Sequence, residues 1–115
     1  MTSSAASSDG FGALRLSSAS LTNLEQLGYT RMTAIQAASL PITLAGQDLI
    51  AQASTGSGKT AAFGLPLVER LQTAGVPGAQ VQAVVLCPTR ELADQVTQEI
   101  RRLARSRPNV KVVTL

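Results

Sequence analysis

Apolar residues along this chain follow two different spacings. In four stretches they recur every three or four residues, which is the spacing of a helix with one buried face. The pattern predicts helices over 21–27, 34–45, 59–73 and 89–105. Ser20 and Thr33 suit the N-cap positions of the first two helices. Gly28 and Gly46 follow the same two helices and are expected to end them.

Three shorter runs lack the helical spacing and favour strands. They are "DLIAQA" (48–53), "VQAVVLC" (81–87) and "NVKVVTL" (109–115). The second run is apolar almost throughout, as expected for a strand that is covered on both faces of a sheet. Alternation of such strands with helices predicts an α/β fold, a parallel sheet flanked by helices. Residues 1–10 are rich in Ser, Ala and Gly, and we expect them to form a disordered leader.

Composition supports one small globular domain. The 115 residues are 44% hydrophobic and 15% charged, which suits a packed core rather than a disordered chain. A net charge of +3 permits a polyanionic partner without requiring one. One cysteine excludes an internal disulfide framework, and no apolar run is long enough for a membrane span. The N-terminus has no signal-peptide pattern, so we expect a cytoplasmic protein without a membrane partner.

The stretch "ASTGSGKT" (53–60) lies between a predicted strand and a predicted helix and matches a phosphate-binding loop. Its glycines would let successive backbone N–H groups converge on an anion, and the dipole of the following helix would add to the attraction. Lys59 would reach the β- and γ-phosphates of a nucleotide, and the Thr60 hydroxyl would bind Mg²⁺. A flexible Gly/Ser turn is the alternative, but the flanking strand and helix both favour the phosphate loop.

Two further stretches narrow the class of nucleotide-binding protein. "LGYTRMTAIQ" (27–36) precedes the loop, and "LCPTRELADQV" (86–96) runs from the end of the second predicted strand into the last predicted helix. Together with the loop they resemble the DEAD-box ATP-dependent RNA helicases, and within that family the bacterial DbpA type most of all. The resemblance runs from Phe11 to the end of the sequence. It implies a partial RecA-like phosphate-loop domain in residues 11–115, with the Q motif at 28–36, motif I at 53–60 and motif Ia at 88–93.

The resemblance also implies roles for individual residues. Gln36 would read adenine, because its amide can donate to N7 and accept from the N6 amine. Phe11 and Arg31 would lie beside the base. The residues expected to hold the phosphates of ATP are Thr55, Gly56, Ser57, Gly58, Lys59 and Thr60, of which Lys59 and Thr60 are also the expected catalytic residues. The residues expected to contact an RNA backbone are Pro88, Thr89, Arg90 and Glu91.

Several of these roles have structural alternatives. Gln36 could lie on a solvated helix face, and Phe11 could belong to the core. Arg90 and Glu91 could pair with each other or solvate the start of their helix. A basic cluster is interpreted as a solvated helix end that complements the helix dipole. Its members are Arg101, Arg102, Arg105 and Arg107.

The 115 residues contain no Asp-Glu-Ala-Asp and no Ser-Ala-Thr stretch, and phosphoryl transfer needs the carboxylates of the former. We therefore expect the N-terminal fragment of a helicase, inactive alone, that uses ATP and Mg²⁺ and acts on structured or ribosomal RNA. The second RecA-like domain of the parent would be absent. Two alternatives are open: another RecA-type ATPase, such as a DNA helicase or translocase, and a truncated protein that only binds nucleotide or RNA.

Overall fold

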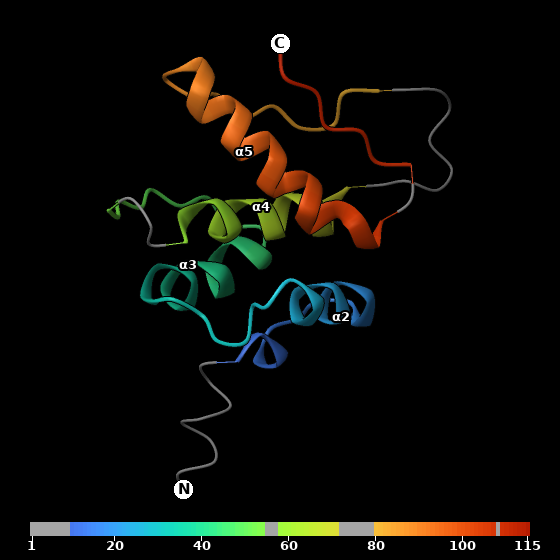
Figure 1. Ribbon diagram of the computed structural model, residues 1–115. Helices are drawn as coiled ribbons and strands as arrows, with labels where there is room; N and C mark the ends of the chain where they lie inside the picture. The colour runs from blue at the N-terminus through green and yellow to red at the C-terminus, as the bar shows by residue number, and fades with distance from the viewer. Residues whose placement is uncertain (1–9, 55–57, 72–79, 108) are drawn as a thin grey trace, which may run out of the picture.

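Helices dominate the computed structural model of this protein (Figure 1). The structure describes residues 10–54, 58–71, 80–107 and 109–115. Its helices are α2 (Ser18–Gln26), α3 (Ala34–Leu44), α4 (Lys59–Arg70) and α5 (Arg90–Leu103), with short 3₁₀ turns η1 (Phe11–Ala13) and η2 (Ala104–Ser106). Helix α4 packs against α3 on one side and α5 on the other, and α2 packs against α5 and η2. In the part of the chain that the structure describes, no helix is long and apolar enough to cross a membrane.

Three of the helices begin at a hydroxyl side chain that accepts a hydrogen bond from the backbone. The Thr33 hydroxyl accepts from the Gln36 N–H at 3.4 Å, as the sequence predicted. At the start of α5, Thr89 accepts from the Leu92 N–H at 3.1 Å. The prediction for α2 was wrong, because Ser17 is the N-cap and accepts from the Ser20 N–H at 3.2 Å. Ser20 therefore lies inside the helix and is buried.

Helices α2 and α3 end at glycine, as predicted. Gly28 and Gly46 have φ angles of +87° and +85°, which glycine adopts without steric cost. Beyond Gly28, the Tyr29 N–H returns to the Leu24 carbonyl at 2.9 Å. The Gln47 N–H makes the equivalent bond to Ile42 at 3.2 Å. These bonds satisfy carbonyls at the helix ends and turn the chain sharply toward the next element.

The core lies where α4 faces its two neighbours. Buried apolar side chains come from all the helices and from η1; they include Phe11, Leu24, Leu40, Ala61, Leu65, Val68, Val96, Ile100 and Leu103. Helices α4 and α5 approach closely at Gly64, where an added Cβ would lie 2.9 Å from Leu103 Cδ1. The helix stack therefore forms the packed part of the described chain.

The predicted parallel sheet is not formed in the described residues. The runs 48–53, 81–87 and 109–115 carry no regular secondary structure. Most of their large apolar side chains face solvent; Ile50 is 101% exposed and Leu86 is 90% exposed. The sheet therefore stays a prediction, because a parallel strand needs a partner backbone on its edges and helices on both faces.

The run 109–115 is attached to the helix stack by hydrogen bonds. In 109–115 the residues alternate, with Val110, Val112 and Thr114 half-buried and the others exposed. Arg101 of α5 donates from Nε and Nη2 to the Val112 carbonyl, at 3.1 and 2.7 Å. The hydroxyls of Thr97 and Thr114 are 2.6 Å apart. The run thus alternates its side chains with the two-residue period of a strand, but in the described residues it has no ladder of backbone hydrogen bonds to another strand.

Candidate nucleotide-binding site

Within the predicted phosphate-binding stretch 53–60, the start of α4 is described. Gly58 is the N-cap, with a φ of +86° and no side chain that accepts from the helix. Lys59 and Thr60 are the first two residues of α4; Lys59 is exposed and Thr60 is half-buried. A helix start without a side-chain cap leaves N–H groups available to an anion. The other predicted phosphate contacts, Thr55, Gly56 and Ser57, lie outside the described residues.

Gln36 joins the start of α3 to the start of α4. Its side-chain Oε1 accepts from the Thr33 N–H at 2.9 Å, which completes a capping box. Its Nε2 donates to the Gly58 carbonyl at 3.1 Å. The side chain is 5% exposed, so the interpretation that places Gln36 on a solvated helix face is wrong. Both ends of the amide are held, which fixes its orientation.

Gly58 is constrained by this contact as well as by its backbone. A Cβ at this position would lie 2.5 Å from Gln36 Nε2 and 3.0 Å from Thr33 Oγ1. The positive φ independently disfavours any residue with a side chain. The absence of a side chain at 58 therefore allows the start of α4 to lie directly against Gln36.

Phe11 lies in the core, close to the loop between α2 and α3. It is 5% exposed, and its ring stacks on Tyr29 with centroids 6.1 Å apart and planes at 21°. This is the core position that the structural alternative predicted, and a contact with the base stays a prediction. Arg31 is exposed on the same loop, two residues beyond Tyr29.

Tyr29 connects this loop to α5. Its hydroxyl donates to the Glu99 carboxylate, which also pairs with Arg102 at 3.2 Å. Burial raises the pKa of Tyr29 to about 12, and the bond to Glu99 adds to the shift because the carboxylate disfavours a phenolate. The phenol therefore remains a donor at neutral pH and holds the loop between α2 and α3 against α5.

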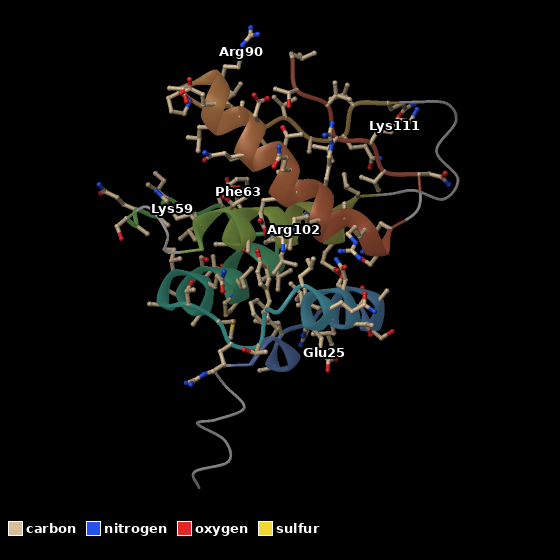
Figure 2. The ribbon with its side chains drawn as sticks, in the orientation of Figure 1. Glu25, Lys59, Phe63, Arg90, Arg102 and Lys111 are labelled. Carbon is tan, nitrogen blue, oxygen red and sulfur yellow. The ribbon has the colours of Figure 1, made fainter. Side chains whose placement is uncertain are left out.

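The predicted RNA-contacting residues lie at the start of α5. Pro88, Thr89, Arg90 and Glu91 are all exposed. Thr89 is the N-cap and Arg90 is the first helical residue, with Glu91 in the first turn. Figure 2 shows Lys59 and Arg90 at the corresponding ends of α4 and α5. The structure thus places the start of α5 on the same side of the helix stack as the start of α4.

Two long-range contacts in this region could not be fully predicted from the sequence. The bond from Gln36 to Gly58 spans 22 residues, although the capping box Thr33-x-x-Gln36 was a readable signal for half of it. Glu69 is the second connection. Its carboxylate accepts from the Ser17 N–H at 3.4 Å and from the Ser20 hydroxyl, and it pairs with Arg107 at 3.4 Å. No local pattern marks Glu69, because its partners come from distant segments.

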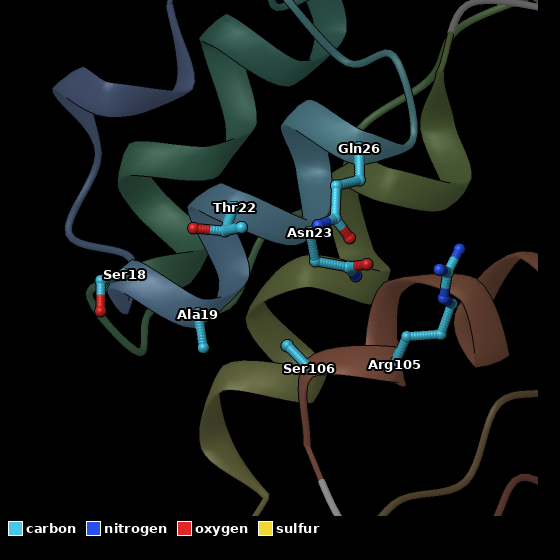
Figure 3. Close-up of a pocket in the computed structure, with 7 residues that line it drawn as sticks. All are labelled: Ser18, Ala19, Thr22, Asn23, Gln26, Arg105 and Ser106. Carbon is cyan, nitrogen blue, oxygen red and sulfur yellow. The ribbon is translucent and has the colours of Figure 1, made fainter.

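A hollow of about 380 Å³ lies between α2 and η2, and its lining includes Ser18, Thr22 and Arg105 (Figure 3). Asn23 also lines it, and its amide donates to the carbonyls of Arg102 and Leu103 at 2.9 and 3.2 Å. Asn23 therefore caps the C-terminal end of α5. The hollow lies at that end, whereas the predicted motif Ia lies at the other.

Comparison with known proteins places these features in a family. The sequence model for "DEAD/DEAH box helicase" matches residues 33–115. The chain is 61% identical over 97 residues to the ATP-dependent RNA helicase DbpA of Escherichia coli K12, covering 84% of this chain and 21% of that protein. It is 47% identical over 97 residues to the ATP-dependent RNA helicase DRS1 of Saccharomyces cerevisiae S288c, covering 84% of this chain and 13% of that protein.

A solved structure is also similar. The crystal structure of a DEAD box protein from the hyperthermophile Methanococcus jannaschii superposes with a TM-score of 0.75 and 40% sequence identity. The match covers 83% of this chain and 25% of that chain. This chain therefore spans about a fifth of the bacterial relative and a quarter of the solved structure.

Proposed function

This chain belongs to the DEAD/DEAH box helicase family, and we propose that it provides the ATP-binding part of an ATP-dependent RNA helicase. It has the RecA-like fold of that family. The observation that carries the proposal is the contact of Gln36 with Gly58, which joins a base-reading candidate to a phosphate-binding candidate. In this assignment the Q motif is 28–36, motif I is 53–60 and motif Ia is 88–93.

Gln36 retains the hydrogen-bonding capacity that adenine requires. A glutamine amide has two N–H donors and two acceptor lone pairs, and the bonds to Thr33 and Gly58 use one of each. One donor and one acceptor remain, and they match adenine N7 and the N6 amine. Guanine presents an acceptor at O6 where adenine presents a donor, so the same amide would disfavour GTP. Phe11 and Arg31 are proposed to lie beside the base.

The start of α4 is proposed to bind the phosphates. Thr55, Gly56, Ser57 and Gly58 would supply backbone N–H groups, and Lys59 would pair with the β- and γ-phosphates. The Thr60 hydroxyl would hold Mg²⁺, which neutralises phosphate charge when it is bound. The uncapped helix start fits this ligand.

Motif Ia is proposed to contact an RNA backbone. Pro88, Thr89, Arg90 and Glu91 are exposed, and Arg90 can pair with a phosphate without reading sequence. We propose that the parent protein is cytoplasmic, closes this domain and a second RecA-like domain on structured or ribosomal RNA, and hydrolyses ATP. In that larger domain, the runs 48–53 and 81–87 would pair as strands of a parallel sheet.

The test is a titration of the chain with ATP and with GTP. Gln36→Ala should lose most of the ATP preference, because a bidentate base contact typically contributes about 1–3 kcal/mol of discrimination. Lys59→Ala should weaken both nucleotides alike, since both present the same phosphates. Gln98→Ala removes the same amide from an exposed position of α5 and serves as the matched control. Retention of the full ATP preference by Gln36→Ala would remove the basis for assigning an adenine site.

A further inference from the structure

The chain beyond the middle of α5 carries positive charge without carboxylates. Its basic residues are Arg101, Arg102, Arg105, Arg107 and Lys111, and no Asp or Glu follows Glu99. These are half of the 10 lysines and arginines in the sequence. Such a concentration of one sign attracts a polyanion if the cations are accessible and not already neutralised.

Four of these cations line one groove. The groove has a volume of about 530 Å³ and lies between the C-terminal end of α5, η2 and the run 109–115. Its charged lining is Arg101, Arg105, Arg107 and Lys111, and its apolar lining includes Val110 and Val112. No carboxylate is among the residues that line it. The groove is therefore lined by positively charged and by apolar side chains.

The four cations differ in how many hydrogen bonds and ion pairs they form within the protein. Arg107 pairs with Glu69 and donates to the Leu71 carbonyl at 3.3 Å, so it has a structural role. Arg101 donates to the Val112 carbonyl, and no carboxylate of the described residues pairs with it, so its positive charge has no counter-charge among them. Arg105 and Lys111 are exposed, and neither forms an ion pair with a described residue. Three uncompensated charges therefore face the groove.

Complementing the dipole of α5 does not account for this arrangement. The last carbonyls of the helix already accept from the Asn23 amide. Lys111 lies eight residues beyond the end of α5 at Leu103, outside the last turn in which the dipole acts. Lys111 belongs to the run 109–115 and not to α5, so the cations that line the groove come from two segments of the chain.

We propose that this groove binds the phosphate backbone of RNA, as a second contact separate from motif Ia. The proposal rests on the proposed function, because it takes RNA as the polyanion. Helix α5 has 14 residues and is roughly 21 Å long, and Arg90 and Arg105 lie at its opposite ends. An RNA that contacts both ends of α5 would run along this helix. The contact carries no base specificity, since every cation in the groove is suited to phosphate.

The test compares two double substitutions with equal loss of charge. Arg105→Gln with Lys111→Gln removes groove cations that hold no other side chain in place. Arg15→Gln with Arg70→Gln removes two exposed cations outside the groove. Binding of a fluorescein-labelled single-stranded oligoribonucleotide to the 115-residue chain is measured by anisotropy at several salt concentrations. Circular dichroism verifies that all the variants fold.

The expected result is a change in salt dependence for the groove variant alone. Losing two phosphate contacts should reduce the slope of log affinity against log salt by about 1.4, while the control variant keeps the original slope. Equal slopes for the two double variants would overturn the proposal, as would a groove variant that binds like the unmodified chain.

Two further measurements separate this proposal from the proposed function. If Arg90→Gln lowers the slope and the groove variant does not, motif Ia contacts RNA and the groove does not. If the unmodified chain binds no RNA, both assignments fail. Polyglutamate that displaces the labelled RNA as effectively as unlabelled RNA would assign the groove to an acidic protein segment and overturn the assignment to RNA.

Discussion

The helix stack and the three apolar runs of this chain contain similar aliphatic residues, yet they bury them very differently. Leu65 in α4 is 1% exposed, whereas Leu86 in the run 81–87 is 90% exposed. A helix closes its backbone hydrogen bonds within itself and needs neighbours on one face only. A parallel strand depends on other strands for its backbone and on helices for both faces. The comparison separates structure that is supported locally from structure that depends on partners.

The run 109–115 lies between these extremes. It alternates half-buried and exposed residues, and Arg101 and Thr97 of α5 hold it by hydrogen bonds. Its attachment to α5 fixes which of its side chains face the helix, although it pairs with no strand among the described residues. Contact with a packed helix is therefore enough to orient an apolar run. Forming a β-strand additionally requires backbone hydrogen bonds to a neighbouring strand.

The largest expected effect comes from truncating the same residue type in the two regions. Leu65→Ala should lower the free energy of unfolding by about 2–5 kcal/mol, because it opens a cavity at the centre of the stack. Leu86→Ala should change it by less than about 0.5 kcal/mol, because its side chain is already in water. Urea unfolding followed by circular dichroism gives both values. An equal loss of unfolding free energy in the two variants would mean that the run 81–87 is packed in solution.

A smaller effect is expected at the junction of α3 and α4. Gly58→Ala should cost about 1–3 kcal/mol, because the new Cβ would crowd Gln36 and the positive φ would become strained. Gly12→Ala is the matched control, since a Cβ there would have nothing within 4 Å and its φ is not positive. The same unfolding assay applies. A Gly58→Ala variant as stable as the control would show that the stack tolerates a shift of this loop.

The smallest effect concerns the run that is attached to α5. Thr114→Val should cost about 0.5–1.5 kcal/mol, because it removes the hydroxyl that contacts Thr97 while it keeps the side-chain shape. Val113→Thr adds a hydroxyl at an exposed neighbouring position and should be nearly neutral. Hydrogen exchange of the α5 amides, compared between the two variants, measures the loss. Identical exchange would mean that the contact does not stabilise the run.

The sequence was informative wherever a structure depends on neighbouring residues. Thr33, Gly28 and Gly46 were recognised because caps and helix ends follow from a residue's own chemistry. The pattern predicts Ser20 as the N-cap of α2, whereas Ser17 is the N-cap. Serine stands at both positions, three residues apart, so residue type alone does not distinguish them. The start and type of α3, α4 and α5 were predicted for the same local reason, since their apolar spacing is regular.

The rest depends on contacts that no local pattern contains. The apolar composition of 81–87 predicted a buried strand, but burial requires partners that composition does not provide. In the candidate site, "GSGKT" and Gln36 were recognised separately. Their direct contact was not, because hydrogen-bond geometry between positions 36 and 58 arises only once α3 packs on α4.

The absence of a side chain at Gly58 has a consequence for how this chain can change over evolutionary time. Gln36 occupies the volume that a Cβ at 58 would need, so the two positions do not vary independently. A smaller residue at 36 would relieve the steric conflict at 58 but would remove the amide from the loop, and the positive φ at 58 would still favour glycine. The effect of a substitution at position 58 therefore depends on the residue at position 36, and the effect of one at 36 depends on the residue at 58.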